Sequence, residues 1–572
     1  MTDTKRTIAA GLLIGLLTLF IPFYLNFIGI APDNSSPDEL GEQVEFSSAP
    51  DSLPVFSSSE VAPASRYEKT ESVAQAGFEV ITDQYRAFVS NAGGGSIQSF
   101  QLIGAGDDGY KYLGGYDDFG QFQKNISVDL ALPINGGCNP CLAKNDDLLF
   151  DAPFSVISDN VANGRQVNLY GADSLVVEME TTEGEYRIKK KTTFFADSYL
   201  IRHDFYTTSS SGENNNFTVL WNDGLRTTEK NIAEEITYSQ GYLAQSKEIH
   251  SIALSPSSIE DREAKQSFSG KTDWVAIRNK YFINSLIAED AIGGSFSGRS
   301  YRLNENTLIP AYTMGLNFNN KNIHVRQFFG PLDVDIIASS KTYLDRVMNF
   351  GWLPIQPFSR SVLWILTKLH LLGINYGLIL ILFAFMIRII TGPLTKKSYQ
   401  STQKMQTVQP ELKKIQEKYK NDSQRLNKEM MNLYKKHGVN PLGGCLPMLL
   451  QMPLLMALFI VFRTTIEFRG QPFIFWITDL SKPDIIFSLP FSIPIYGSGV
   501  AILPLIMGAT LFMTMQMTSA TMDKNQKPIM YFMNGFFILL FNSFPSGLNL
   551  YYTAYNVMSF MQQRSIRNKL AA

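Results

Sequence analysis

Long stretches without any charged residue recur along the chain, separated by segments dense in charge. Residues 8–30 form the first, a run of 23 residues that, at about 1.5 Å per residue in a helix, exceeds a hydrocarbon core of about 30 Å. Further uncharged runs cover 371–387, 442–462, 485–522 and 528–563. This pattern predicts a polytopic α-helical membrane protein.

The two longest runs have to be divided. In 485–522, Pro490, Pro494 and the Gly-Ser-Gly at 497–499 break the first part, so about 500–517 is left to cross the membrane. The 36 residues of 528–563 would form a helix of roughly 54 Å, and the Asn-Ser-Phe-Pro-Ser-Gly sequence at 542–547 supplies a turn at their midpoint. The span before them stops at Gly392-Pro393. Six transmembrane helices are therefore predicted.

Basic residues give the orientation, since cytoplasmic segments of membrane proteins are enriched in Lys and Arg. Lys5 and Arg6 precede the first span, a basic tail follows the last, and 394–441 holds eleven Lys or Arg against four acidic residues. Both termini are therefore predicted to lie in the cytoplasm. A cleaved signal peptide is the alternative for 8–30, but the length of the run and Pro32 favour an uncleaved anchor.

The region between the first two spans has a different pattern. Residues 31–75 are rich in Pro, Ser and acidic residues and predict a flexible tether. From 78 to about 334, short alternating segments such as 186–195 and 217–221 recur between Gly, Asn and Asp clusters. They predict a large extracytoplasmic all-β domain, a sandwich of two sheets. A mixed apolar and basic segment at 358–372 predicts a helix along the membrane interface.

The chain is predicted to consist of thirteen consecutive segments. It comprises an N-terminal anchor 1–30, tether 31–75, β domain 76–340, linker and interfacial helix 341–372, second span 373–393, cytoplasmic hairpin 394–441, third span 442–464, outer loop 465–499, fourth span 500–518, cytoplasmic loop 519–527, fifth span 528–544, sixth span 545–563 and basic tail 564–572.

The basic loop predicts a helical hairpin, because apolar residues recur at intervals of three and four at 405, 408, 412, 415 and 419 and again at 426, 430 and 433. Asn421-Asp422-Ser423 caps the turn, and His437-Gly438 ends the second helix. The predicted outer faces carry Lys404, Lys413, Lys414, Lys418, Lys420, Lys428, Lys435 and Lys436. These lysines either solvate the hairpin and enforce topology, or contact anionic headgroups or ribosomal RNA.

Arg388 is the strongest single candidate for a functional residue, because it is a charged residue inside a predicted span. It precedes Pro393 by five residues, which places it roughly 7–8 Å inside the cytoplasmic end of its span, where a charge must snorkel, pair or face water. No Asp or Glu lies in any other span. Uncharged polar residues occupy the later spans at or below mid-depth: Gln451, Thr514, Gln516, Asn534 and Asn556. Such groups can join helices, but beside an unpaired Arg they favour a wet cavity open to the cytoplasm.

Several motifs resemble those of the YidC/Oxa/Alb membrane protein insertases. They are Asn440-Pro441-Leu442-Gly443-Gly444-Cys445-Leu446-Pro447 with Gln451-Met452-Pro453, Arg388 before Gly392-Pro393-Leu394-Thr395, Gln409-Pro410-Glu411, and Phe544-Pro545-Ser546-Gly547-Leu548. The resemblance covers the chain from about 350 to its end. The N-terminal anchor and the large β domain resemble the Gram-negative type of this family, with a supersandwich-like periplasmic domain.

The resemblance implies an insertase and folding chaperone of the bacterial inner membrane, not an enzyme, without cofactor, metal or small-molecule substrate. Implied partners are nascent membrane proteins, the Sec translocon, the ribosome and anionic phospholipids. A groove open to the cytoplasm and the lipid would attract an acidic substrate tail through Arg388. The predicted groove set is Arg388, Gln451, Thr514, Gln516, Asn534, Asn556 and Tyr552.

Two cysteines and the absence of known catalytic motifs also bear on the function. Cys138 and Cys141 have the spacing of a redox or metal site, but no helix pattern follows and no His is near, which favours a local disulfide. Known hydrolase and ATPase motifs are absent. A transporter would predict repeated halves, which the sequence lacks. A membrane-anchored periplasmic enzyme or glycan-binding protein is the other alternative.

Overall fold

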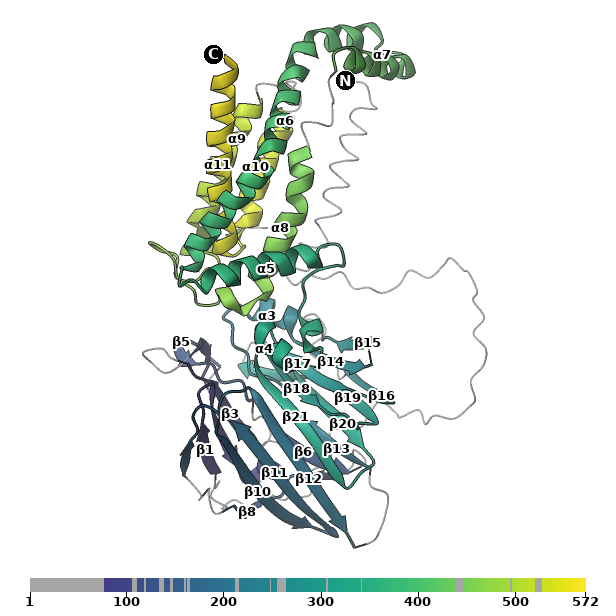
Figure 1. Cartoon of the computed structure of the whole chain (residues 1–572), viewed down its shortest axis with the longest axis vertical. Helices are drawn as coiled ribbons and strands as arrows, with labels where there is room; N and C mark the ends of the chain where they lie inside the picture. The colour runs from purple at the N-terminus through teal and green to yellow at the C-terminus, as the bar shows by residue number, and fades with distance from the viewer. Residues whose placement is uncertain are drawn as a thin grey trace, which may run out of the picture. The chain divides into compact units, whose positions relative to one another are not determined.

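The computed structural model describes residues 77–571 except 105–110, 118–119, 133–137, 145–147, 159–160, 162–164, 211–215, 247, 255–263, 305–306, 341, 439–445, 494–495 and 520–526. The predicted N-terminal anchor and tether lie outside these residues. The chain divides after Val347 into two compact units, one rich in strands and one helical, and each is described by itself (Figure 1).

The strand-rich unit runs from β1 to the short helix η2. Its strands are β1 Gly77–Ile81, β2 Tyr85–Ser90, β3 Ile97–Leu102, β4 Leu113–Tyr116, β5 Phe122–Ser127, β6 Cys141–Lys144, β7 Leu148–Phe150, β8 Ser155–Val156, β9 Gln166–Asn168, β10 Ser174–Glu183, β11 Tyr186–Phe195, β12 Leu200–Ser209, β13 Phe217–Trp221, β14 Gln240–Gln245, β15 Glu248–Ile252, β16 Ala264–Ser269, β17 Trp274–Arg278, β18 Phe282–Ile287, β19 Gly293–Asn304, β20 Thr307–Phe318 and β21 Asn322–Pro331. Its helices are α2 Ala92–Gly95, α3 Ile232–Tyr238, α4 Val334–Ser339 and η2 Leu344–Val347.

Two large antiparallel sheets form the body of this unit. A nine-stranded sheet has the order β15-β14-β17-β18-β21-β12-β11-β10-β8, and a six-stranded sheet has the order β16-β19-β20-β13-β6-β7. A smaller sheet, β3-β2-β1-β9, adjoins them. The ring centre of Phe329 on β21 lies 5.0 Å from that of Trp221 on β13 and 4.4 Å from that of Phe100 on β3. All three sheets therefore share one aromatic core. The predicted β-rich domain is confirmed.

Alternation along β11 shows why this sequence forms a strand. Tyr186, Ile188 and Lys190 are buried, whereas Arg187 and Lys189 point outward and pair diagonally with Glu180 and Glu178 of β10 at 2.8 and 2.7 Å. The alternation with a period of two places one set of β11 side chains in the core and the other on the surface. The surface ion pairs between β10 and β11 stabilise the pairing of the two strands. Lys190 departs from the pattern, because it is a basic residue on the buried face.

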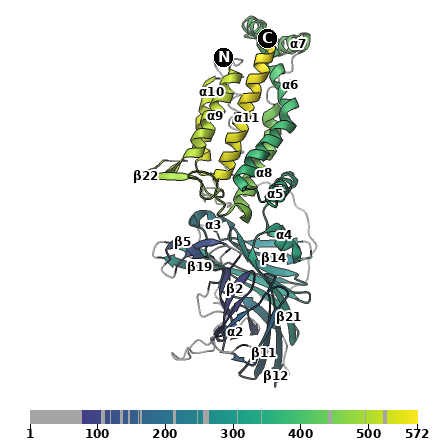
Figure 2. The same cartoon turned by 60° about the vertical axis from the view of Figure 1, so that its left-hand side comes forward.

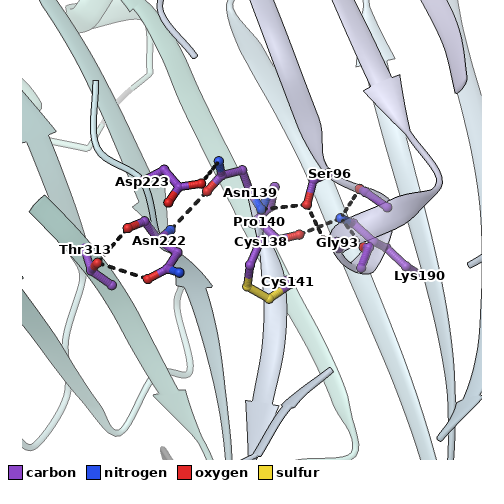
Figure 3. Close-up of a disulfide and its surroundings, with 12 residues drawn as sticks. Gly93, Ser96, Cys138, Asn139, Pro140, Cys141, Lys190, Asn222, Asp223 and Thr313 are labelled. Atoms are coloured by element: carbon purple, nitrogen blue, oxygen red, sulfur yellow. Dashed lines mark hydrogen bonds between the residues drawn. A yellow bond between two sulfur atoms is a disulfide. The ribbon is translucent and has the colours of Figure 1, made fainter. Parts of the chain in front are cut away.

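The residues just before β6 join segments of the three sheets (Figure 3). A disulfide links Cys138 to Cys141. Between them, the Asn139 N–H donates to Ser96 Oγ at 2.8 Å, and its side-chain amide donates to Asp223 at 3.3 Å and accepts from the Asn222 N–H at 3.0 Å. One short loop thus ties the segment before β3 to the segment after β13.

Lys190 completes this junction. Its ammonium is fully buried and donates to the carbonyls of Gly94, Gly95 and Pro140 at 3.2, 2.7 and 2.6 Å (Figure 3). Burial lowers the pKa of Lys190 to about 7, because the surroundings solvate the charged form less well than water does. Gly94 approaches β6 so closely, with φ +72°, that a Cβ there would lie 2.8 Å from the Cβ of Cys141.

The helical unit contains α5 Gln356–His370, α6 Tyr376–Lys418, α7 Ser423–Lys436, α8 Leu446–Thr464, η3 Ile466–Phe468, the strands β22 Ile485–Ile493 and β23 Gly497–Ala501, α9 Ile502–Ser519, α10 Lys527–Phe541 and α11 Ser546–Ala571. Helices α6, α8, α9, α10 and α11 run side by side, and α5 crosses one end of them (Figures 1 and 2). The part of α6 from Tyr376 to Ser398 is long and apolar enough to cross a membrane, and 451–464, 502–516 and 530–541 are shorter apolar helices.

Two helices extend past the predicted ends of their spans. Beyond Gly392-Pro393, where the second span was predicted to stop, α6 continues as a helix through Pro393 and Pro410 to Lys418. Thr391 and Thr395 Oγ1 donate to the carbonyls of Ile387 and Thr391 at 2.8 and 3.0 Å, one turn back along the same helix. The predicted tail 564–572 is also helical as far as Ala571, as a continuation of α11.

The two helices of the basic loop contact each other along the apolar positions. Val408 of α6 and Leu433 of α7 are buried together, and Met405, Leu412 and Ile415 pack against them. Asp422 caps α7 by accepting from the Arg425 N–H at 3.0 Å. These contacts give the hairpin its shape.

Candidate functional site

Arg388 is buried in the helical unit, with 6% of its surface exposed. It lies on α6, twelve residues after Tyr376, which corresponds to about 18 Å along the helix. Its Nη1 donates to the hydroxyl of Tyr555 on α11 at 3.3 Å, and the guanidinium carbon lies 5.5 Å from the centre of the same ring. Tyr555 therefore contacts the cation in two ways.

Arg388 has no carboxylate beside it within the described bundle. The described parts of α8 to α11 contain no Asp or Glu, and no salt bridge joins Arg388 to an acid among the described residues. Nε and Nη2 of Arg388 are buried and lack a hydrogen-bond partner in this part of the chain. A buried cation in this state needs water or an anionic group.

Two hydrogen bonds from predicted groove residues link α9 to its neighbours α10 and α11. Thr514 donates to the backbone carbonyl of Asn556 at 3.4 Å, linking α9 to α11. Asn534 of α10 is buried and donates to the Gly508 carbonyl of α9 at 3.4 Å. Oδ1 of Asn534 has no partner among the described residues. The structure thus gives two of these residues a role in joining helices, and it leaves one acceptor unused.

Gln451 and Tyr552 lie together where α8 meets α11. The Gln451 side chain is close enough to interact with the hydroxyls of Tyr551 and Tyr552. None of these contacts is a hydrogen bond of good geometry, because Nε2 of Gln451 and both hydroxyls are buried without partners in the described chain. Gln516 differs from the rest of the set, since its side chain is exposed on α9.

Unpaired buried polar atoms gather in this bundle. They are Arg388 Nε and Nη2, Gln451 Nε2, Asn534 Oδ1, Asn549 Oδ1, the hydroxyls of Tyr551 and Tyr552, Gln562 Oε1 and Gln563 Oε1, all counted against the described residues. Each such atom would cost about 1–3 kcal/mol if it stayed without a partner. Native proteins satisfy such groups with water or ligand, so this cluster predicts hydration.

Sequence analysis missed Tyr555 and the polar row to which it belongs. Tyr551, Tyr555, Ser559 and Gln563 follow one another at intervals of four, which places them on one face of α11. The rings of Tyr551 and Tyr555 stack at 6.1 Å, and Gln563 donates to Ser559 at 3.3 Å. That spacing was the signal that could have found the row.

The remaining predicted residues belong to the α6–α7 hairpin or to the strand-rich unit. The eight hairpin lysines are all exposed on α6, on α7 or in the turn between them. Cys138 and Cys141 belong to the strand-rich unit, where they are buried and bonded to each other. No group of three or more His, Cys, Asp or Glu is placed to hold a metal ion among the residues that the structure describes.

Family models match both units. Residues 160–365 match the YidC periplasmic domain, and residues 367–572 match the 60Kd inner membrane protein. A membrane protein insertase YidC of Chlorobium luteolum is 37% identical over 459 residues, covering 73% of this chain and 77% of the relative. One of Chloroherpeton thalassium is 38% identical over 403 residues, covering 68% and 67%. A crystal structure of an active YidC insertase is 18% identical, with a TM-score of 0.35 over 86% of this chain and 92% of that one.

Proposed function

Because the chain belongs to the YidC family of membrane protein insertases, we propose that it inserts nascent membrane proteins through a hydrated groove built around Arg388. The family inserts proteins into the inner membrane and is not enzymatic, and the strand-rich unit matches its periplasmic domain. The observation that carries the groove is the buried, acid-free Arg388 in a helical unit whose helices α8, α10 and α11 also hold buried polar atoms without partners among the described residues.

Hydration is the first step of the proposed mechanism. Water bound to the unpaired atoms of Gln451, Asn534 and Tyr552 lowers the cost of bringing a polar substrate segment to mid-bundle depth. The substrate tail then exchanges bulk water for groove water and fixed protein dipoles. The groove therefore lowers the free-energy cost of desolvating the substrate tail, and this step needs no nucleotide hydrolysis.

Attraction by Arg388 is the second step. A tail carboxylate 5 Å from the guanidinium would gain about 1.5–3 kcal/mol at effective dielectric constants between roughly 40 and 20. That gain corresponds to roughly a 10- to 200-fold higher occupancy of the groove by an acidic tail. The apolar segment of the substrate then partitions into lipid, at roughly −0.3 to −0.6 kcal/mol for each central Leu, Ile, Phe or Val.

The proposed topology has six spans with both termini in the cytoplasm. Residues 8–30 and helices α6, α8, α9, α10 and α11 cross, and α5 lies in the outer interface. The uncharged part of α11, 546–563, reaches about 27 Å, and α10 about 22 Å. Spans this short are accommodated by local thinning of the bilayer.

The α6–α7 hairpin is proposed to face the cytoplasm. Its eight exposed lysines fit anionic phospholipid headgroups and the phosphates of ribosomal RNA through charge alone. Cooperation with the Sec translocon is the remaining part of the proposal, and it follows from the family resemblance of the sequence.

A charge series at Arg388 tests this function. The purified chain is reconstituted in liposomes, and insertion is measured for two single-span clients that differ only in an acidic or a neutral translocated tail. We expect Arg388→Lys to retain most of the preference for the acidic tail, Arg388→Ala to lose it and Arg388→Glu to invert it. Arg165→Glu reverses an exposed charge in the strand-rich unit, away from the proposed groove and hairpin residues, and serves as the matched control.

Equal insertion of both clients by all four Arg388 proteins would contradict the proposed role of the charge. It would leave Arg388 as a residue that reaches the headgroups from within the bundle.

A further inference from the structure

The segment before α9 forms a β-hairpin that exposes apolar side chains. Strands β22 and β23 pair in antiparallel register, with Ile485 opposite Ala501 and Ser488 opposite Gly499. Large side chains on both faces of β22 are exposed: Ile485, Ile486, Phe487 and Phe491, the last at 60%. No charged residue occurs from 485 to 522. We name strands β22 and β23 the apolar hairpin.

Water is an unfavourable environment for this hairpin. A two-stranded ribbon is marginally stable by itself, and its unpaired edges beside exposed Ile and Phe would promote aggregation. The hydrocarbon core is equally unfavourable, because the backbone N–H and C=O groups along those edges would have no partner there. The headgroup and acyl boundary satisfies both requirements, since apolar side chains can enter lipid while the strand edges reach water.

A neighbouring turn exposes two aromatic rings in the same way. Phe475 is 85% exposed and has a φ of 60°, a left-handed conformation that is unfavourable for a residue with a side chain. Its ring stacks on that of Trp476 at 5.9 Å. Trp is enriched at membrane–water interfaces, where it forms part of the interfacial aromatic belt.

Asp484 fixes the hairpin and the aromatic turn to the start of α9. Its Oδ2 accepts from the Trp476 indole at 2.9 Å and from the N–H groups of Ile502 and Leu503 at 3.2 and 2.8 Å. The charged residues end at Asp484, and the apolar strand begins at the next position. Both elements are therefore held at the level of the first turn of α9.

The direction of the hairpin agrees with this level. It extends sideways from the end of the helical bundle at which α5 also lies, across the direction of α9 and α10 (Figures 1 and 2). An element with this direction lies in the plane of a bilayer that α9 crosses.

We infer that the apolar hairpin and the Phe475–Trp476 turn lie in the interfacial layer of the outer leaflet, with lipid as their partner. This inference rests on the proposed crossing of the membrane by α9. Lipid is favoured over a protein partner because the hairpin carries no charged residue that could anchor such a partner and leads directly into α9, whose Leu505 and Ile506 side chains are also exposed.

Depth-dependent fluorescence quenching in liposomes tests the inference. Single cysteines are introduced at Phe491, at Phe512 and at Tyr170 in a full-length Cys445→Ser background, and each is labelled with an environment-sensitive dye. All three side chains are exposed, so each label can be carried without disturbing a core. Phe512 reports on α9, and Tyr170 on the strand-rich unit. Quenchers are placed near the headgroup, at the chain end, and in water as iodide.

We expect the label at 491 to be quenched at least about twofold more by the shallow lipid quencher than by the deep one, and to be protected from iodide relative to the label at 170. Iodide quenching at 491 equal to that at 170, with the label at 512 in lipid, would overturn the inference and leave the span of α9 intact. Deep quenching at 491 would overturn the interfacial placement. Iodide quenching at both 491 and 512 would overturn the inference together with the proposed topology.

Discussion

Replacing Tyr555 tests whether the exact position of the Arg388 charge matters for insertion. The hydroxyl of Tyr555 accepts from Arg388 at 3.3 Å, and the ring lies 5.5 Å from the guanidinium carbon. Tyr555→Phe removes the hydrogen bond and keeps the ring. Tyr555→Leu removes both contacts with the cation.

The two contacts set the expected size of the effect. A hydrogen bond to a charged group is worth about 1.5–3 kcal/mol, and at 3.3 Å we take about 1 kcal/mol, or roughly fivefold. The ring adds about 0.5–2 kcal/mol for a partly desolvated cation. We therefore expect insertion of the acidic-tail client to fall roughly fivefold in Tyr555→Phe and roughly 30-fold in Tyr555→Leu.

The comparison of two clients separates positioning from structure. A misplaced Arg388 weakens attraction for an acidic tail, so the neutral-tail client should be inserted at nearly the wild-type rate by both variants. Tyr531→Phe removes an exposed hydroxyl from α10 and serves as the control. Equal losses for both clients would refute the reasoning, because they would make Tyr555 a packing residue alone.

Two further predictions concern the rest of the chain. The unfolding free energy of the strand-rich unit should rise between about pH 7 and pH 10, since unfolded Lys190 keeps its proton up to about 10.5 while burial has lowered the folded pKa to about 7. Hydrogen exchange at β11 in the full chain measures this, and a slope that persists in Lys190→Met would contradict it. Val408→Asp should destabilise the packing of α7 on α6 by about 2–4 kcal/mol, because it places a charge against Leu433. Protease sensitivity of α7 measures this, with Lys404→Gln as control, and unchanged sensitivity would refute it.

The strands were predictable because alternation is a local property. The segments 186–195 and 217–221 are β11 and β13, with the same bounds. Lys190 could not be predicted as a buried residue, since it stands in a run of three lysines that reads as polar. Only the tertiary arrangement brings the carbonyls of Gly94, Gly95 and Pro140 around its ammonium.

Helix ends were less predictable. Pro393 predicts a stop because proline removes a backbone N–H, yet α6 continues through it. Only one helical hydrogen bond is lost at each proline, and the rest of α6 holds the helix across both positions. The apolar hairpin was missed for another reason, since β22 is apolar on both faces and so lacks the alternation that marks a strand at a water-facing surface.

The helix on which each site residue lies was predictable, and its partners were not. Charge-free runs give a position along a helix, which is why Arg388, Asn534 and Gln451 could be singled out. Which residues meet depends on the rotation of each helix and on its neighbours, and this brings Tyr555 to Arg388 while leaving Gln516 exposed. The role of the whole groove set in insertion stays a prediction.

Insertion by the purified chain alone is the most direct test of the central claim. The wild-type protein is reconstituted in liposomes without nucleotide or any other protein, and protease protection of the acidic translocated tail of a single-span client is measured. The account predicts protected tail well above the level in protein-free liposomes, and a further loss when Arg388 is changed to Glu. No protected tail above that level, with folded and correctly oriented protein and a client of proven competence, would contradict it.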